Sequence, residues 1–359
     1  MSKIEILSSG KINLDLIIKG KRADGYHDIS SLIQPIGLQD TLLIENTNSS
    51  KLIDLDFPDK TISYDDNLII KAAKSFYEYF QISQAIKITV KKKIPLESGM
   101  GGGSSNAAAT LLGLSKIFGI DDFKGLLSIG KELGSDVPFF LYSKTARISG
   151  KGEIVEIIEN PAKTKYLLIF PGFGSSTKSL YSLWDQEKLK IKNYNKSIET
   201  KKISFDKKTV YLRNDFLPLL IERHKEYKEI FKILDELELN NYSISGSGST
   251  IFSVLEDGFD TEEAEKYLES SMNIKAFTVN SIEGWRFLID WICFIFLYHL
   301  RIGPSSKGRT LGFGPSNGGS TPSGPASSSL VYVKVVYLGA LEVHYKFAGV
   351  AYCEFKWVQ

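Results

Sequence analysis

Apolar and polar residues alternate near the start of the chain, in residues 11–18 (KINLDLII). Lys11, Asn13 and Asp15 share one side of this segment, and apolar residues fill the other side. A period of two predicts a half-buried strand with one polar face. Residues 22–45 then predict a turn at an Asp-Gly pair, followed by two further strands.

A helical spacing of apolar residues follows. Residues 67–80 (NLIIKAAKSFYEYF) repeat apolar positions every three to four residues, and Asn67 is expected to cap this helix. Residues 85–94 predict a strand that runs into a glycine-rich loop, and residues 121–134 predict another helix.

The later part of the body mixes both patterns. The strands are predicted at 165–170, around 243–254 and at 274–282, and the helical segments near 179–184, at 219–238 and at 260–272. Because strands and helices alternate without a regular βαβ repeat, the sequence predicts an α+β fold rather than a doubly wound parallel sheet.

Composition narrows the class of protein. The chain has 359 residues, 43% of them hydrophobic and 24% charged, which is typical of a globular protein with room for two domains. A net charge of +2 gives no support to nucleic-acid or membrane-surface binding. The two cysteines form no disulfide framework or zinc site, and the N-terminal segment has no signal-peptide run. We therefore expect a cytoplasmic protein.

The composition changes near residue 288. The following segment opens with WICFIFLYHL, which is too short to span a membrane, and continues through a stretch rich in Gly, Ser and Pro to the β-like LVYVKVVYLGALEVHYKF. We predict that residues 288–359 are a low-complexity or appended tail that is poorly ordered and unrelated to the body. The alternative is a genuine C-terminal accessory, with an apolar helix and added strands.

The glycine-rich loop in residues 91–114 (KKKIPLESGMGGGSSNAAATLLGL) carries the first chemical signal. A glycine inside a helix or strand destabilises the fold by about 0.5–1 kcal/mol relative to alanine, so a cluster of glycines at this position calls for a physical explanation. One reason is a set of backbone amides that approach an anion at the start of a helix, which Ser104 or Ser105 would cap and Gly119 would end. The alternative is a surface linker. The loop is neither a Walker P-loop nor a Rossmann fingerprint, because it lacks their characteristic partners.

Two further signals fit the same chemistry. Lys11 and Asn13 lie on one strand face, and Asp136 stands in GSDVPFF, where a proline restricts the backbone. Phosphoryl transfer needs amides around the phosphates, a cation, and a carboxylate near the attacking hydroxyl.

Four segments together resemble the GHMP kinases. PLESGMGGGSSNAA resembles their second motif and SISGSGSTIFSV their third, while GKINLDLIIKGKRADGYHDISSL and GSDVPFFL resemble the branch that phosphorylates 4-diphosphocytidyl-2-C-methyl-D-erythritol. The resemblance covers residues 5–287. It implies a two-domain GHMP-kinase fold, with domains at 1–160 and 161–287 and the active site in the cleft between them. It also implies ATP-dependent phosphorylation of the 2-hydroxyl of that substrate, in the non-mevalonate isoprenoid pathway.

The resemblance assigns roles residue by residue. Asp136 would accept the hydroxyl proton and Lys11 would hold that carboxylate ionised. Asn13 would bind substrate near the reacting centre, Tyr26 and His27 would recognise the cytosine, and Tyr181 would offer it a second aromatic ring. Mg²⁺ would lie near a serine, Ser105 in particular. The ATP-binding residues would be Pro95, Ser98, Gly99, Gly101, Gly102, Gly103, Ser104 and Ser105, with Gly246 and Gly248 in the third motif.

Each single residue also has an ordinary structural interpretation. Lys11 could be a solvated charge, Asp136 a helix cap, and Tyr26 and His27 turn residues. Two positions depart from the family: Gly10 stands where alanine is common, which we expect to be harmless, and Asp15 replaces an apolar residue and could pair with Lys11. Another GHMP small-molecule kinase, or a catalytically dead nucleotide-binding paralogue, remains the alternative. Apart from a small-molecule substrate, we expect no nucleic-acid partner and no membrane span, and the chain to be a monomer or homodimer.

Overall fold

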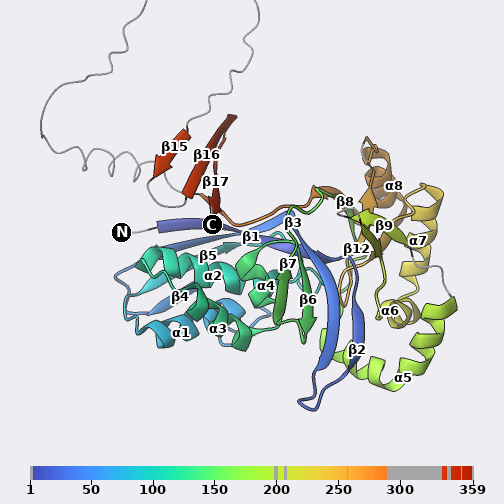
Figure 1. Ribbon diagram of the computed structural model, residues 1–359, viewed down its shortest axis with the longest axis horizontal. Coiled ribbons are helices and arrows are strands. Elements are labelled where there is room, and N and C mark those ends of the chain that lie inside the picture. The colour runs from blue at the N-terminus through green and yellow to red at the C-terminus, as the bar shows by residue number, and fades with distance from the viewer. Residues whose placement is uncertain are drawn as a thin grey trace, which may run out of the picture. The chain divides into compact units, whose positions relative to one another are not determined.

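The computed structural model describes residues 3–197, 201–205, 208–256, 258–288, 334–337, 341–348 and 350–357. Met1–Trp285 form one compact unit and Arg286–Gln359 a second one. Among the described residues, the first unit contains both helices and strands, and the second contains four strands; Figure 1 labels most of these elements. Within the described residues, no helix is both long and apolar enough to cross a membrane.

The larger sheet of the first unit is mostly antiparallel and is built from the first half of the chain. Its path runs β1-β3-β5-β4, with β2 and β6 also paired to β3, and β7 paired to β6; β4 and β5 run parallel, and the other pairs among these strands are antiparallel. The strands are β1 (Lys3–Asn13), β2 (Ile17–Lys21), β3 (His27–Asn46), β4 (Ile53–Asp56), β5 (Ile86–Lys91), β6 (Ala146–Gly150) and β7 (Ile154–Ile157).

Two predictions about these strands are wrong. Residues 22–45 were predicted to hold two strands, but β3 is a single strand of 20 residues. Where two strands were expected, the chain stays in one strand and accommodates a register shift opposite Ser9 and Gly10 of β1. The predicted strand 11–18 is in turn interrupted after Asn13, and β2 begins at Ile17.

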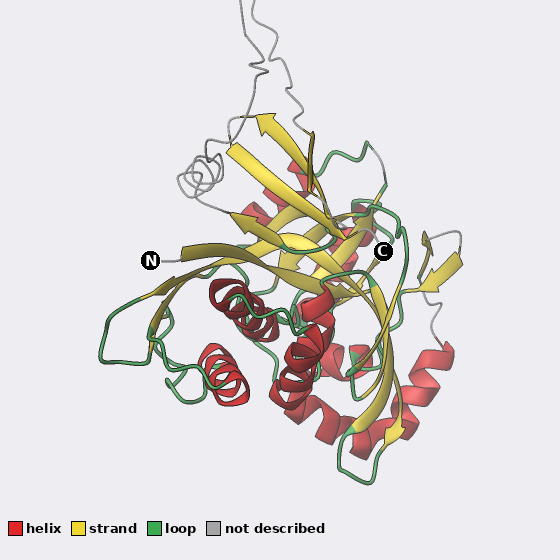
Figure 2. Ribbon diagram, turned by 60° about the vertical axis from the view of Figure 1, so that its left-hand side comes forward, coloured by secondary structure: helices red, strands yellow, loops and turns green. Residues whose placement is uncertain are grey.

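Four helices cover one face of this sheet: α1 (Leu68–Phe80), α2 (Gly102–Phe118), α3 (Phe123–Leu133) and α4 (Val137–Tyr142). They lie together beneath the strands in Figure 1, and the turned view in Figure 2 shows the helices and strands as separate layers. Asn67 caps α1 as predicted, because its side chain accepts a hydrogen bond from the Ile69 N–H at 3.0 Å. Gly119 ends α2 in the left-handed conformation that glycine adopts easily.

The second half of the chain builds a separate four-stranded antiparallel sheet in the order β11-β12-β8-β13. Its strands are β8 (Lys165–Phe170), β11 (Tyr242–Ile244), β12 (Ile251–Leu255) and β13 (Lys275–Asn280), and a two-stranded sheet joins β9 (Lys202–Phe205) to β10 (Lys208–Tyr211). The helices are α5 (Thr177–Ser197), α6 (Leu217–Arg223), α7 (Glu226–Glu236) and α8 (Glu262–Met272). Largely antiparallel sheets combined with helices agree with the α+β prediction. The predicted domain boundary at residue 160 stays a prediction.

A continuous apolar core joins the two sheets. Ile12 and Leu32 from the larger sheet belong to the same buried cluster as Tyr166, Leu168 and Phe252 from the smaller one. Burying side chains of this size stabilises a fold by about 1.5–3 kcal/mol each. Because the apolar side of β1 is anchored in this core, its neighbouring polar residues are held on the opposite side in a fixed position.

The second unit contains β14 (Arg286–Leu288), β15 (Lys334–Tyr337), β16 (Leu341–Ala348) and β17 (Val350–Trp357). The last three strands pair antiparallel in the order β15-β16-β17. The β-like pattern read from the sequence is therefore found as strands. Residues 289–333, on which the predicted apolar and Gly/Ser/Pro-rich segments fall, lie outside the described residues, and the predicted tail remains a prediction.

Candidate active site

A cavity of about 410 Å³ brings together residues that lie far apart in the sequence. It is lined by the end of β1, the glycine loop, the start of α4, the start of α5 and the loop between β11 and β12. Most of the predicted site residues line it: Lys11, Asn13, Pro95, Ser98, Gly99, Gly101, Gly102, Gly103, Ser104, Asp136, Tyr181 and Gly246. Four predicted residues do not, namely Tyr26, His27, Ser105 and Gly248.

Lys11 and Asn13 are held rigidly at the end of β1. Both are buried, with 5% of each residue exposed. The Lys11 ammonium donates to Asn13 Oδ1, and the Asn13 amide donates to Ser31 Oγ at 2.8 Å. Because both residues point into the cavity and not to solvent, the predicted polar face of this strand is a site wall.

The negative charge of Asp136 acts on the ammonium group of Lys11. Burial lowers the pKa of Lys11 below its usual value, and the negative charge of Asp136 opposes part of that effect. The same carboxylate adds to burial in raising the pKa of Tyr181. Asp136 occupies the N-cap position of α4, yet its side chain makes no capping hydrogen bond. Its carboxylate is therefore free of the structural role that the sequence left open.

Helix α2 begins earlier than predicted. Gly101, and not Ser104 or Ser105, is its N-cap residue, with a φ of 68° and no side chain to cap the helix. The first intrahelical bond runs from the Ser105 N–H to the Gly101 carbonyl at 2.9 Å. The N–H groups of Gly102, Gly103 and Ser104 consequently have no intrahelical acceptor and lie at the cavity wall. An anion in the cavity would meet these donors and the positive end of the helix dipole.

The two glycine loops pack directly against each other. A Cβ added to Gly99 would come within 2.2 Å of the Ser245 carbonyl oxygen and 2.7 Å of the Gly248 carbonyl oxygen. Ser245 Oγ donates to the Gly99 carbonyl at 3.2 Å, and the Thr250 N–H donates to the Ser98 carbonyl at 3.1 Å. Only a residue without a side chain at position 99 allows this approach. The third motif thus packs against the glycine-rich loop of residues 95–105 and supports it.

Gly246 links this support to the end of β1. A Cβ at Gly246 would lie 3.0 Å from Asn13 Oδ1 and 3.1 Å from Lys11 Nζ. The Asn13 N–H also donates to Ser245 Oγ at 3.2 Å. The strand that carries Lys11 and the two glycine-rich loops therefore meet at one place.

The adjacent serines Ser104 and Ser105 differ in environment. Ser104 lines the cavity, whereas Ser105 is fully buried and accepts a hydrogen bond from Ser8 Oγ at 2.7 Å. The side of α2 that carries Ser105 is packed on β1. Ser104 is thus the better placed of the two to reach a metal ion.

Asp15 pairs with Arg147 and not with Lys11, which the sequence had left possible. The Arg147 guanidinium donates to both Asp15 carboxylate oxygens, at 2.8 and 2.7 Å. Because the strand is interrupted after Asn13, Asp15 no longer continues the face that carries Lys11. At the other departure, Gly10, a Cβ would find contacts of 3.5 Å and longer, so the alanine common in the family would also fit; that the glycine is harmless stays a prediction.

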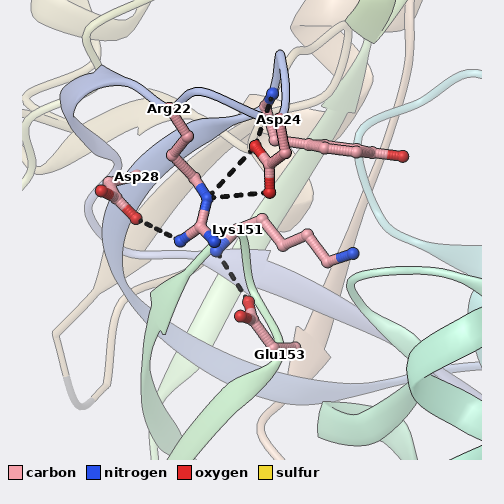
Figure 3. A network of polar contacts seen from close by, with 6 residues as sticks. Arg22, Asp24, Asp28, Lys151 and Glu153 are labelled. Atoms are coloured by element: carbon pink, nitrogen blue, oxygen red, sulfur yellow. Dashed lines mark hydrogen bonds and ion pairs between the residues drawn. The ribbon is translucent and has the colours of Figure 1, made fainter.

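Tyr26 lies at the tip of the β2–β3 hairpin. Its ring is about half exposed, and the Lys151 ammonium lies 4.7 Å from the ring centroid. Figure 3 shows the polar network around this tip. Arg22 binds the carboxylates of Asp24 and Asp28, and the Lys151 N–H donates to Glu153. One face of the Tyr26 ring is therefore covered by a cation.

His27 is buried beside the cavity. Its ring stacks on Tyr181 at 4.6 Å and an interplanar angle of 16°. Tyr181 lines the cavity, so His27 lies directly behind a residue of the cavity wall.

Two supporting residues were missed in the sequence. The buried Asn214 amide donates to the carbonyl oxygens of Ile244 and Gly246, at 2.7 and 2.8 Å, and so holds the third-motif loop. Thr177 Oγ1 lies 2.8 Å from Ser247 Oγ and joins the start of α5 to the same loop. An asparagine beside an acid just before the apolar FLPLL segment was the available signal for Asn214.

Comparison with known proteins identifies the family. The model of the GHMP kinases N terminal domain matches residues 67–144, which include the glycine loop and Asp136. The chain is 36% identical over 266 residues to the 4-diphosphocytidyl-2-C-methyl-D-erythritol kinase of Thermodesulfovibrio yellowstonii, covering 72% of this chain and 92% of the relative. It is 34% identical to the Syntrophus aciditrophicus enzyme of the same name, covering 78% of this chain and all of the relative. The chain belongs to the 4-diphosphocytidyl-2-C-methyl-D-erythritol kinase family.

Solved structures agree with this family assignment. A crystal structure of a 4-(cytidine 5'-diphospho)-2C-methyl-D-erythritol kinase matches with a TM-score of 0.62 and 26% identity, covering 78% of this chain and 100% of that one. A homoserine kinase from Cytophaga hutchinsonii shares the fold, with a TM-score of 0.57 and 16% identity over 80% of this chain and 98% of that one. The predicted GHMP-kinase fold is confirmed, and the kinase family accounts for the convergence of Lys11, Asp136 and two glycine loops on one cavity.

Proposed function

We propose that this protein transfers the terminal phosphoryl group of ATP to the 2-hydroxyl of 4-diphosphocytidyl-2-C-methyl-D-erythritol, within the non-mevalonate isoprenoid pathway. The family relationship supports this substrate. The observation that carries the chemistry is the cavity itself, which joins Lys11, Asp136 and the uncapped first turn of α2.

The glycine loop fits a triphosphate. Gly99 and Gly101 have φ values of 75° and 68°, a conformation that turns backbone amides toward a ligand where side chains would obstruct it. The first-turn N–H groups of α2 and the helix dipole favour negative charge at the same place. These features support ATP as the phosphoryl donor, which a GHMP kinase uses.

Mg²⁺ is the expected cofactor, and the hydroxyl of Ser104, which lines the cavity, would help to hold it together with the phosphates of ATP. The ion would neutralise charge on the phosphates during transfer. Among the described residues there is no group of three or more His, Cys, Asp or Glu side chains that could hold a metal by itself. A site that relies on ATP oxygens and a serine agrees with that finding.

Asp136 would accept the proton of the attacking hydroxyl. Its side chain is not used for helix capping, and a carboxylate near a hydroxyl is a suitable general base. Lys11 would place its positive charge beside that carboxylate and offset the negative charge that develops during transfer. Asn13 orients the Lys11 ammonium through its Oδ1 and would contact the substrate near the reacting carbon.

The cytidine end of the substrate would bind at the β2–β3 hairpin. Tyr26 offers an aromatic face for stacking, His27 a ring for hydrogen bonding, and Tyr181 connects this region to the cavity. Base stacking on an aromatic ring contributes about 1–3 kcal/mol in nucleic-acid complexes.

A substrate panel tests the proposal. ADP release is measured with purified full-length protein, ATP and Mg²⁺, using the cytidine-linked substrate beside mevalonate, homoserine and galactose. We expect turnover with the cytidine-linked compound alone. Turnover with another member of the panel and none with this one would favour a different GHMP kinase, and nucleotide binding without any turnover would favour a dead paralogue.

A biosynthetic kinase that uses ATP is expected in the cytoplasm. Analytical ultracentrifugation of the purified protein would distinguish a monomer from a homodimer.

A further inference from the structure

One face of helix α5 encloses the imidazole of His27. Tyr181, Trp184 and Asp185 are spaced at i, i+3 and i+4 and therefore lie on the same side of the helix. Tyr181 stacks on the ring, Trp184 meets it edge-on at 5.5 Å and 84°, and Asp185 Oδ1 lies 2.7 Å from His27 Nε2. About 5% of the His27 side chain is exposed. Its ring is thus held by contacts at one face, one edge and one nitrogen.

The carboxylate of Asp185 determines which ring nitrogen carries the proton. Its second oxygen, Oδ2, accepts from the Lys21 ammonium at 2.6 Å. The hydrogen bonds from Lys21 and His27 lower the pKa of Asp185, so the group is ionised at neutral pH. An ionised carboxylate only accepts hydrogen bonds, and therefore Nε2 of His27 must be the protonated nitrogen.

We propose that Asp185 is a positioning residue that fixes the tautomer of His27 and thereby selects cytosine over uracil in the substrate. The inference rests on the proposed function, which brings a pyrimidine base to His27. It concerns Asp185, a residue that the sequence motifs did not single out.

The chemistry follows from the free nitrogen. A neutral imidazole protonated at Nε2 carries a lone pair on Nδ1 and can accept one hydrogen bond there. Cytosine presents a 4-amino group, which donates, whereas uracil presents an oxygen at the same place, which only accepts. An oxygen that faces the Nδ1 lone pair leaves both groups unsatisfied in a buried site, which is costly. Without Asp185 the proton is free to move to Nδ1, where it would pair with the uracil oxygen.

The experiment compares kcat and KM of the full-length protein for the cytidine-linked substrate and for its uridine-linked analogue. Wild type, Asp185→Ala and Lys21→Ala are measured in parallel. Lys21→Ala is the matched control, because it removes the exposed partner of Asp185 and leaves the contact with His27 in place. We expect Asp185→Ala to lose at least about 10-fold of the cytidine preference, through KM rather than kcat, and Lys21→Ala to keep it.

The tautomer itself provides a second measurement that needs no turnover. Nitrogen chemical shifts of His27 in ¹⁵N-labelled wild type should show a protonated Nε2 and an unprotonated Nδ1, and Asp185→Ala should shift this balance. A protonated Nδ1 in the wild type, or an unchanged cytidine preference in Asp185→Ala, would overturn the inference while leaving the proposed function intact. Absence of wild-type turnover with the cytidine-linked substrate would overturn the proposed function, and the selectivity for cytosine would fall with it.

Discussion

Asp136 is the residue on which the proposed chemistry depends most directly. Asp136→Asn keeps the shape of the side chain but removes its ability to accept a proton and its charge. We expect turnover to fall by about 10²–10⁴-fold while the Kd for ATP stays nearly unchanged, because the carboxylate acts mainly in the transition state. Steady-state rates and nucleotide titration measure the two effects. Asp54→Asn, at an exposed ion pair with Lys51, is a matched control that should behave as wild type; near-native turnover of Asp136→Asn would refute the mechanism.

Lys11 gives the reaction an alkaline limit. Burial lowers its pKa below the ordinary lysine value of 10.5, so the ammonium loses its proton at a lower pH than an exposed lysine does. In the proposed mechanism the charged form is the active one, and kcat/KM should therefore decrease as the pH rises through this lowered pKa. A pH profile of kcat/KM from neutral to strongly alkaline pH measures this limit. Lys11→Arg stays charged over that range and should lack the decrease, whatever its rate. A wild-type profile that remains flat up to pH 10.5 would show that the charge of Lys11 is not required.

Ser104 and Ser105 separate a ligand role from a structural one. Ser104→Ala removes a hydroxyl that lines the cavity, and we expect a higher Mg²⁺ requirement and a KM for ATP raised by about 10-fold, with unchanged thermal stability. Ser105→Ala breaks a buried hydrogen bond with Ser8 and should cost about 1 kcal/mol of unfolding free energy, with little effect on metal dependence. The opposite assignment of the two effects would return the metal role to Ser105.

At the scale of elements, the two glycine loops behave as one unit. Gly99→Ala places a Cβ 2.2 Å from a backbone oxygen at a positive φ, so neither partner has room to relax. We expect a loss of several kcal/mol in unfolding free energy, or no folded protein. Gly103→Ala is the matched control: its nearest neighbour would be Leu68 Cδ1 at 3.5 Å, and alanine favours the helix. Urea unfolding of both variants measures the contrast, and equal stability would mean that the loops are not tightly packed.

The sequence predicted elements better than their boundaries. Asn67 and Gly119 were correct as helix ends because caps are local interactions between a side chain or a φ angle and the adjacent turn. The start of α2 was placed at Ser104 or Ser105, since serine is the usual cap. The helix instead begins at Gly101 because the third-motif loop, about 150 residues away, holds the chain there.

The candidate site was likewise predicted as a set of residues and not as an arrangement. Lys11 and Asp136 meet at one cavity, as the family resemblance implied. The partner of Asp15 could not be read from local spacing, because Arg147 arrives on β6, which pairs with a different strand. Asn214 and Asp185 escaped notice for the same reason: their roles exist only through contacts made across the fold.

At the scale of the whole molecule, the kinase accounts for about four fifths of the chain. The Syntrophus aciditrophicus relative is covered completely by 78% of this sequence. We therefore expect that a chain ending at Leu288, which keeps β14 whole, folds and retains the kinase activity of the full-length protein. Circular dichroism, thermal unfolding and the ADP-release assay on both proteins measure this. Loss of folding or turnover on truncation would assign residues 289–359 to the working enzyme.

The start of α2, where Gly101 leaves the first turn without a side-chain cap, has a consequence for how the protein responds to its supply of nucleotide. Glycine at this position lacks the side-chain hydrogen bond that a serine or aspartate would provide, a difference of about a few tenths of a kcal/mol, and leaves the first-turn N–H groups open to a ligand. In the nucleotide complex, phosphate oxygens would act as the missing cap, so ligand occupancy and local folding become one linked equilibrium. The melting temperature should therefore rise with nucleotide concentration, and the protein should be most sensitive to proteases when the cellular ATP concentration is low.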